Sequence, residues 1–269
     1  MRETLRRLLA GELTASEAEA ELRREQLEEL GGRARLDVGR IARRGLPEVV
    51  LAAGKSPQDL ARLTVALARE QGQGLASRLG EEHWRALEGE VQVEGHQLAR
   101  YSDAARVTRP GFSPAPRRAR AGIVTAGTSD VAVADEARML VEACGIEARL
   151  VADVGVAGLH RLLEPLAGLL AWDADVLVVA AGMDGVLPGL VAGLVDLPVI
   201  GLPVSTGYGM GGRGEAAFLA MLQSCATGLT VVNLDNGIGA GAAAVLIASR
   251  AASARRPEPA AERPMRPAR

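Results

Sequence analysis

Aromatic side chains, cysteine and lysine are all scarce in this sequence, and each scarcity excludes a class of protein. Aromatic residues are 2% of the chain, so the core has to be built from aliphatic side chains and alanine within an apolar share of 48%. Two cysteines, Cys144 and Cys225, do not make a disulfide framework. Lys55 is the only lysine among 31 basic residues. The net charge of -2 means that the chain has no strong field of one sign, so nothing in its charge favours binding to nucleic acid or to an anionic membrane.

Long uninterrupted apolar runs are also missing. The N-terminal residues Met1 to Thr4 carry charges early and are not followed by the apolar core of a signal peptide. The most apolar region, residues 166–202, is interrupted by aspartates and prolines, which is typical of a series of buried elements. We therefore expect a soluble, cytoplasmic protein that binds neither membrane nor nucleic acid.

Residues 1–108 predict a smaller N-terminal domain of helical or mixed character. Thr14 and Glu17 have the spacing of a capping box, and we expect two short helices within residues 1–30. A strand-like run at 46–51 precedes an amphipathic helix over residues 58–71. Residues 109–119 hold three prolines and a glycine, so they predict a linker.

Residues 120–252 predict a second domain of α/β class. Apolar strand patterns alternate with helical patterns, which indicates a parallel sheet covered by helices on both faces. Residues 253–269 are rich in Pro, Arg and Ala and predict a disordered tail. The expected strands are 121–126, 148–154, 175–180, 197–204 and 229–233, and the expected helices are 130–143, 157–170, 186–194, 215–226 and 240–252.

Five polar, glycine-containing loops follow the five expected strands. In a parallel sheet the carboxyl ends of the strands share one edge, where ligands bind. Together the loops therefore predict a ligand site at that edge. They are residues 127–130, 153–158, 182–185, 205–209 and 233–237.

The loop after the first strand has the features of a phosphate site. Thr128 and Ser129 supply hydroxyls beside backbone N–H groups at a helix start, although Ser129 or Asp130 could equally be a helix cap. A dinucleotide fingerprint is excluded at this loop because the Gly-x-Gly-x-x-Gly spacing does not begin at Gly127. His160 begins another helix and could be either a surface residue or an acid–base group.

Asp184 and Cys225 are the candidates for chemistry. A carboxylate at position 184 set against apolar walls would hold its proton more tightly, as a proton-transfer group requires, or it could cap the next helix. Cys225, between a helix and a strand, could be packing or a nucleophile. Cys144 has the surroundings of helix-end packing.

Two basic residues of the N-terminal domain, Arg40 and Lys55, could hold a phosphate-bearing ligand or could be solvated charges. Lys55 lies in a Gly-Lys-Ser run, but a P-loop would need glycine where Val49 stands. No His/Cys cluster has metal-ligand spacing, so the metal ligands stay unknown.

Several of these strings resemble a known family. The 127–130 loop and the block 182–209 look like PurE, the aminoimidazole ribonucleotide carboxylase/mutase fold family. A longer match is to the LarB family, the PurE-like proteins of nickel-pincer cofactor biosynthesis. The strings similar to LarB are residues 36–40, 44–50, 54–55, 153–161, 224–226 and 233–237.

This resemblance implies a PurE-like three-layer αβα sandwich and a pyridinium-3,5-biscarboxylic acid mononucleotide synthase. Such an enzyme carboxylates nicotinic acid adenine dinucleotide at ring carbon 5 with CO2 or bicarbonate and hydrolyses the phosphoanhydride, releasing AMP. By this analogy Cys225 is the nucleophile and Asp184 the proton-transfer group, where the family has glutamate.

The resemblance also implies the other contacts and partners. Phosphate and ribose contacts would come from Thr128, Ser129, Asp130, Ser205 and Tyr208. Mg²⁺ would act on the pyrophosphate, no organic cofactor would be needed, and the chain would form a homo-oligomer, commonly an octamer. Two alternatives stay open, namely a PurE-like enzyme acting on aminoimidazole ribonucleotide and a non-catalytic dinucleotide-binding oligomer.

Overall fold

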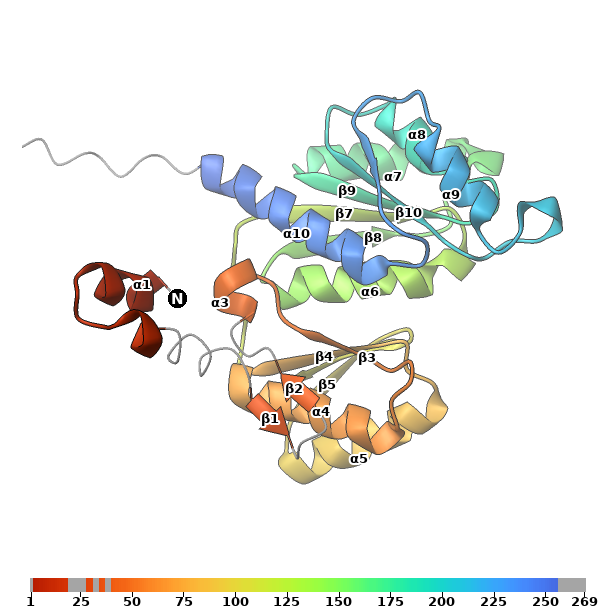
Figure 1. Cartoon of the computed structure of the whole chain (residues 1–269). Coiled ribbons are helices and arrows are strands. Elements are labelled where there is room, and N and C mark those ends of the chain that lie inside the picture. The colour runs from red at the N-terminus through yellow and green to blue at the C-terminus, as the bar shows by residue number, and fades with distance from the viewer. Residues whose placement is uncertain (1, 19–27, 31–33, 37–39, 256–269) are drawn as a thin grey trace, which may run out of the picture.

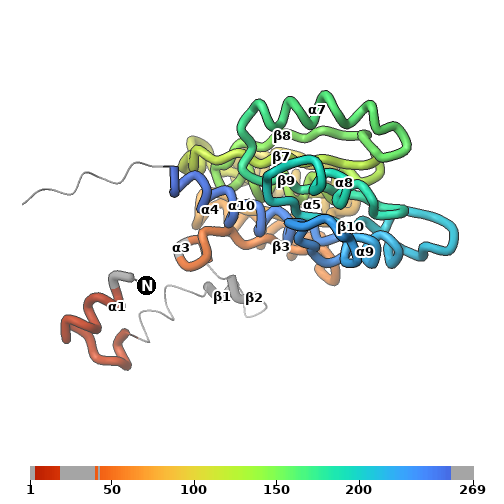
Figure 2. The backbone as a smooth tube through the Cα atoms, turned by 90° about the horizontal axis from the view of Figure 1, so that it is seen from above, coloured from red at the N-terminus to blue at the C-terminus, as the bar shows by residue number. Residues whose placement is uncertain are grey.

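Two sheets, joined by one shared helix, organise the chain. The computed structural model describes residues 2–18, 28–30, 34–36 and 40–255. A four-stranded sheet belongs to the N-terminal unit and a five-stranded sheet to the C-terminal unit, with α6 (Val131–Ala143) between them (Figure 1). Helix α1 (Arg2–Leu9) lies away from both sheets in two perpendicular views (Figures 1 and 2).

The N-terminal unit has strand order β3-β4-β6-β5, with β3 and β4 parallel and the other pairs antiparallel. Helices α4 and α5 pack on the sheet face turned away from α6, burying Leu60, Leu67 and Leu87 (Figure 1). The elements are α3 (Arg40–Arg44), β3 (Val49–Leu51), α4 (Pro57–Gln71), β4 (Gln73–Ser77), α5 (Glu81–Glu94), β5 (Gln97–Tyr101) and β6 (Ala104–Thr108).

Two predictions near the N-terminus have different outcomes. The capping box is confirmed, because the Thr14 N–H donates to Glu17 Oε2 at 2.8 Å and the Glu17 N–H donates to Thr14 Oγ1 at 3.2 Å. The expectation of helix up to residue 30 is wrong at its end. There β1 (Glu28–Leu30) pairs in the antiparallel direction with β2 (Ala34–Leu36). This pairing gives hydrogen-bond partners to backbone groups that would have none at the end of a helix. Residues 19–27 lie outside the described residues.

The C-terminal unit confirms the predicted three-layer sandwich around a parallel sheet. Its strand order is β11-β10-β9-β7-β8, and every pairing is parallel. Helices α6 and α10 cover one face, and α7, α8 and α9 cover the other (Figure 1). The elements other than α6 are β7 (Arg120–Thr125), β8 (Glu147–Val151), α7 (His160–Ala171), β9 (Val176–Ala181), α8 (Val186–Ala192), β10 (Val199–Pro203), α9 (Glu215–Leu222), β11 (Leu229–Val231) and α10 (Gly237–Ala254).

Strand β9 shows why the sheet needs helices on both faces. All six of its residues are buried, and alternate side chains enter different cores. Val176 and Val178 pack towards α6 and α10, whereas Leu177 and Val179 pack towards α7 and α8. Since each such side chain stabilises the fold by roughly 1.5–3 kcal/mol when buried, an uncovered face would expose a large share of the core.

Two helix ends differ from the prediction. Helix α9 ends at Leu222, earlier than the predicted 226, which leaves Cys225 in the following loop. Helix α10 begins at Gly237, before the predicted 240, because Asn236 Oδ1 accepts the Gly239 N–H at 2.8 Å and caps the helix. Its end at Ala254 lies two residues inside the predicted tail, whose residues 256–269 are outside the described part of the chain.

Among the described residues, α10 is the one helix whose length and composition would allow it to cross a membrane. Its Ala240, Ala244 and Ala248 are buried in the core that it shares with α6 and the sheet. This packing is that of a core helix in an α/β unit.

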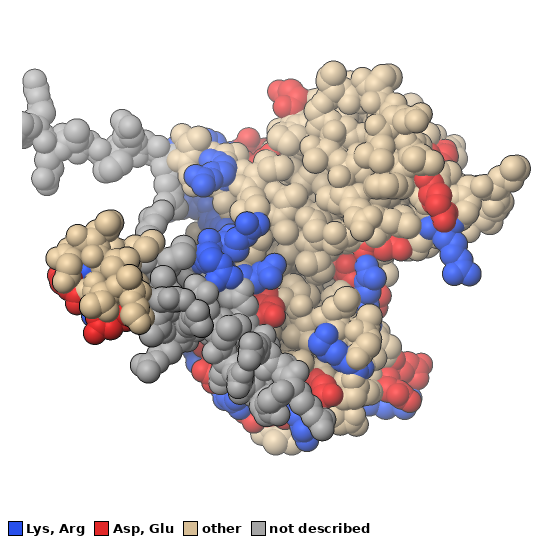
Figure 3. Space-filling model, in the orientation of Figure 1, with Lys and Arg blue, Asp and Glu red and all other residues tan. Residues whose placement is uncertain are grey.

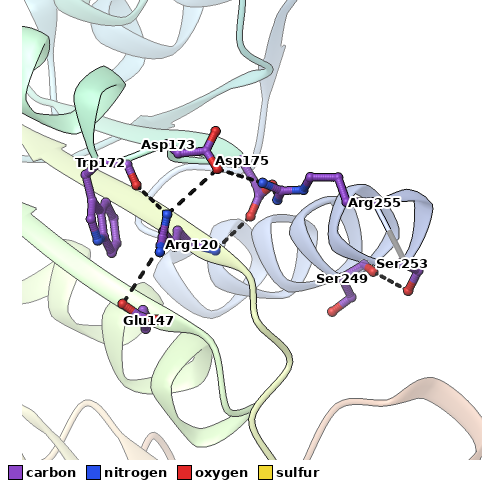
Figure 4. A network of polar contacts seen from close by, with 8 residues as sticks. All are labelled: Arg120, Glu147, Trp172, Asp173, Asp175, Ser249, Ser253 and Arg255. Atoms are coloured by element: carbon purple, nitrogen blue, oxygen red, sulfur yellow. Dashed lines mark hydrogen bonds and ion pairs between the residues drawn. The ribbon is translucent and has the colours of Figure 1, made fainter. Parts of the chain in front are cut away.

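A polar cluster holds the C-terminal end of α10 to the amino end of the sheet (Figure 4). Asp175, whose side chain is 4% exposed, accepts the backbone N–H of Arg120 at 2.7 Å and pairs through its other oxygen with Arg255. Asp173 also pairs with Arg255, at 2.8 Å, but its side chain is 69% exposed. The Arg120 guanidinium donates to the Trp172 carbonyl at 2.8 Å.

We expect Asp175→Asn to lower the free energy of unfolding by about 1–3 kcal/mol, because it removes the charge of a buried carboxylate that accepts a backbone hydrogen bond and pairs with the half-exposed Arg255. Asp173→Asn is the control, because it removes the charge of an exposed carboxylate that pairs with the same arginine. It should lower the free energy of unfolding by less than about 0.5 kcal/mol. Urea unfolding of both variants measures the difference. Equal losses of unfolding free energy in the two variants would show that the burial of Asp175 does not strengthen its contribution to stability.

Candidate functional site

A cleft of about 530 Å³ opens at the carboxyl ends of the parallel strands. Its walls come from the loops after β7, β8, β9 and β10, as the sequence predicts. The fifth predicted loop, 233–237, supplies no wall residue. That expectation is corrected: this loop contacts the loop after β10 instead, where Asp235 Oδ1 accepts the Ser205 N–H at 2.8 Å.

Asp130 ties two walls of the cleft together. Its side chain is buried, with 3% of the residue exposed. One carboxylate oxygen accepts the Gly127 N–H at 2.8 Å, and the other accepts the hydroxyl of Thr206 at 2.8 Å. Asp130 therefore fixes the shape of the loop after β7 and joins it to the loop after β10. Ser129 also lines the cleft, whereas Thr128 is exposed and is not among its lining residues.

The loops after β9 and β10 approach each other closely at Gly182. A Cβ atom at this position would lie 2.2 Å from the Thr206 carbonyl oxygen, so only glycine fits. The same carbonyl accepts the Met183 N–H at 2.9 Å. This contact joins two walls of the cleft, which Asp184 and Tyr208 also line.

Arg161 is a cleft residue that the sequence reasoning missed. It is the one basic side chain among the lining residues and pairs with Asp153 at 2.8 Å. The predicted His160 is exposed and does not line the cleft. In α7 the Arg161 side chain reaches back over Gly158, towards the helix N-terminus, and this direction is the signal that would have favoured Arg161 over its neighbour.

Asp184 is exposed at the cleft, so the expectation of apolar walls around it is wrong. Its Oδ1 accepts the Val186 N–H at 3.2 Å, but the N-cap of α8 is Gly185, so the alternative of an N-cap at Asp184 is not confirmed either. The backbone turns into α8 immediately after Asp184, and this turn directs the carboxylate outwards, away from the core that Leu187 enters.

Cys225 lines a second, smaller cavity of about 260 Å³. Its walls come from Gly185 and the first turns of α8, from Ala220 of α9, and from residues 224–226 of the loop after α9. Asp184 and Cys225 therefore stand on different sides of the start of α8 and face different cavities within one chain.

Four other predicted residues have different positions. Tyr208 lines the cleft, whereas Ser205 supports it through its backbone contact with Asp235. Lys55 Nζ donates to the Leu51 carbonyl at 3.0 Å, and Arg40 begins α3, beside α10 (Figure 1). Neither of these two basic residues lines the cleft.

The two cysteines have opposite environments. Cys144 ends α6 and is buried, which confirms helix-end packing, and burial raises the pKa of its thiol to about 11. Cys225 is exposed, and both thiols are free. Because the thiolate is the nucleophile, Cys225 is the thiol that can react. Among the described residues, no three His, Cys, Asp or Glu side chains group as metal ligands.

Comparison with known proteins agrees with this geometry. Residues 120–262 match the family model of AIR carboxylase, and residues 27–110 match that of the LarB/PurE-like N-terminal domain. The chain belongs to the LarB/PurE-like family. The two family models correspond to the two units of the structure, with β6 ending at Thr108 and β7 beginning at Arg120.

Two relatives illustrate the family. An uncharacterized protein of Methanocaldococcus jannaschii is 36% identical over 252 residues, which cover 92% of this chain and 96% of the relative. The N5-carboxyaminoimidazole ribonucleotide mutase of Mycobacterium tuberculosis is 34% identical over 140 residues, which cover 50% of this chain and 75% of the mutase. Members of the LarB/PurE-like family thus share the C-terminal unit with named carboxylase/mutase enzymes.

We expect one rapid and one slow thiol reaction when the native protein is mixed with a disulfide reagent such as 5,5′-dithiobis(2-nitrobenzoic acid) at pH 8. Cys225 is exposed, whereas at this pH only about one in a thousand Cys144 thiols is ionised at a pKa of about 11. The rates should differ by about 100-fold or more. Cys225→Ser should remove the rapid phase, and urea should make both thiols react. A rapid phase that survives Cys225→Ser would contradict this assignment.

Proposed function

We propose that this LarB/PurE-like protein carboxylates the pyridinium ring of nicotinic acid adenine dinucleotide at carbon 5 and hydrolyses the phosphoanhydride. The products are pyridinium-3,5-biscarboxylic acid mononucleotide and AMP. The observation that carries the proposal is the exposed Cys225 in its own cavity beside the cleft, in a chain with a LarB-type N-terminal domain. A carboxylase or mutase is the coarser activity that the family supports.

The reaction needs a nucleophile that first activates the pyridinium ring, and a thiol can supply it. A pyridinium ring is too electron-poor to attack CO2. Addition of the Cys225 thiolate at carbon 4 forms a C–S bond and moves an electron pair onto the ring nitrogen, which makes carbon 5 nucleophilic. Carbon 5 then bonds to CO2, a base takes the carbon 5 proton, and the C–S electron pair leaves with sulfur. We assign the base role to Asp184, which is exposed at the cleft.

The cleft supports a phosphate-bearing substrate. Its volume lies within the range of roughly 300–1,000 Å³ typical of small-molecule sites. Arg161 supplies a positive charge, and Ser129 and Thr206 supply hydroxyls. A magnesium ion, expected from the resemblance, has no group of protein ligands among the described residues, so we propose that it enters bound to the pyrophosphate of the substrate.

The separation of Asp184 from Cys225 favours a homo-oligomer, which we propose as an octamer in the cytoplasm. Exposed apolar side chains surround both cavities, among them Met183, Val186, Leu219 and Leu222. The surface over α8 and α10 carries few charges (Figure 3). A second copy that covers this surface would bring the Cys225 cavity of one chain towards the cleft of another.

A second candidate function is that of an N5-carboxyaminoimidazole ribonucleotide mutase. The 34% identity with the Mycobacterium tuberculosis mutase, together with the AIR carboxylase match over residues 120–262, favours it. This candidate leaves Cys225 and the N-terminal unit without a role. Turnover of the imidazole ribonucleotide, with none of nicotinic acid adenine dinucleotide, would decide for it.

Cys225→Ala should abolish formation of AMP and carboxylated product from nicotinic acid adenine dinucleotide, bicarbonate and magnesium, by on the order of 10⁴-fold or more, because the nucleophile is lost. Cys144→Ser is the matched control and should keep activity within a few-fold, since that thiol is buried away from both cavities. Mass spectrometry should detect a pyridine adduct on Cys225 of the native enzyme. Full activity in Cys225→Ala would contradict the proposal.

Asp184→Asn should lower kcat by about 10²–10⁴-fold with a small change in KM, because the amide cannot accept the ring proton. Asp184→Glu keeps a carboxylate and introduces the glutamate that the family resemblance implies, so it should keep kcat within about tenfold of the native value. Steady-state kinetics at pH 7.5 compare the two variants. An Asn variant as active as the Glu variant would reject Asp184 as the base.

A further inference from the structure

Arg78 of the N-terminal unit contacts the C-terminal unit beside the cleft. It follows β4 directly, with a left-handed backbone angle of φ 62°. Its guanidinium donates to the Asp235 carbonyl at 2.6 Å, and its Nε lies 3.6 Å from Glu136 Oε1. Arg78 therefore bridges α6 and the loop that leads into α10.

Glu136 holds the inner end of this bridge. Its side chain is 4% exposed and accepts the Ser77 hydroxyl at 2.5 Å. A Cβ atom on Gly237 would lie 2.7 Å from the Glu136 Cβ, so the carboxylate packs directly against the first turn of α10. Burial raises the pKa of Glu136, while the Ser77 hydrogen bond and the charge of Arg78 act in the opposite direction. The buried carboxylate thus has partners from both units.

Asp235 carries the contact onward to the cleft. Its backbone N–H donates to the Pro203 carbonyl at 2.9 Å, and its Oδ1 accepts the Ser205 N–H at 2.8 Å. The next residue, Thr206, binds Asp130 and begins the wall formed by residues 206–208. A continuous series of contacts therefore leads from Arg78 through Asp235 to that wall.

We propose that Arg78 is a positioning residue for the 206–208 wall, so that the N-terminal unit controls how tightly the cleft binds its substrate. Loss of the guanidinium would free the Asp235 carbonyl and so loosen Ser205, which Asp235 holds through its side chain. The identity of the substrate rests on the proposed function, but the contact series does not.

Another hydrogen bond between the units provides a matched control. The Ser102 hydroxyl donates to Asp135 Oδ2 at 2.6 Å, on the same helix as Glu136. Within the described part of the chain, Ser102 makes no hydrogen bond or ion pair with residues 203–208 or 233–237. Ser102→Ala therefore weakens the interface between the units and leaves the contact series to the cleft intact.

The kinetic experiment compares Arg78→Ala, Arg78→Lys and Ser102→Ala in the full chain. Arg78→Ala should raise KM for nicotinic acid adenine dinucleotide about tenfold with kcat within about twofold, because the wall binds substrate but does no chemistry. Arg78→Lys should restore part of the loss, since an ammonium can still donate to the Asp235 carbonyl. Equal effects of Arg78→Ala and Ser102→Ala, or a loss in kcat alone, would overturn the proposal.

A second readout needs no substrate. The loop after β10 contains the exposed Arg213, and because Gly214 on the other side of the trypsin-cleaved bond is buried, we expect cleavage to speed up when the loop opens. Arg78→Ala should speed the appearance of the fragment ending at Arg213 about tenfold under native conditions, and Ser102→Ala should not. An unchanged cleavage rate in Arg78→Ala would overturn the proposal even if the native enzyme leaves the dinucleotide untouched. Faster cleavage without turnover would support it and reject the proposed substrate instead.

Discussion

The burial of α6 between two sheets is the constraint on which the rest of the structure depends. One side of the helix packs on the parallel sheet and α10, and another meets β4, β5 and β6. Three of its carboxylates each accept a hydroxyl hydrogen bond across the interface: Asp135 Oδ2 from Ser102, Glu136 from Ser77 and Glu142 from Tyr101. Because unpaired buried carboxylates are costly, the N-terminal unit stays where these hydroxyls can reach α6.

The same helix begins at the cleft. Asp130 lies immediately before it and joins the loops after β7 and β10, while Glu136, two turns later, takes part in the contacts of Arg78. The cleft and the interface between the units are therefore two ends of one rigid element. The LarB-type domain is therefore attached to the element that shapes the site.

The proposed chemistry makes a further demand on this scaffold. Asp184 and Cys225 flank the start of α8 and face separate cavities, although the reaction needs both groups at neighbouring atoms of one ring. A rigid αβα layer does not bring them together by small side-chain movements. The exposed apolar surface around the two cavities offers the alternative that a second copy completes each site.

Periodicity and strand-end loops in the sequence determined the parallel α/β unit, its two helical layers and four of the loops that line the cleft, because these features follow from local pattern and the common edge of parallel strands. Tertiary structure alone decided the rest. The exposure of Asp184, the choice of Arg161 over His160 and the cavity that Cys225 faces depend on where a backbone turns within one or two residues. The role of Arg78 depends on contacts 157 residues apart in the chain, which no local pattern encodes.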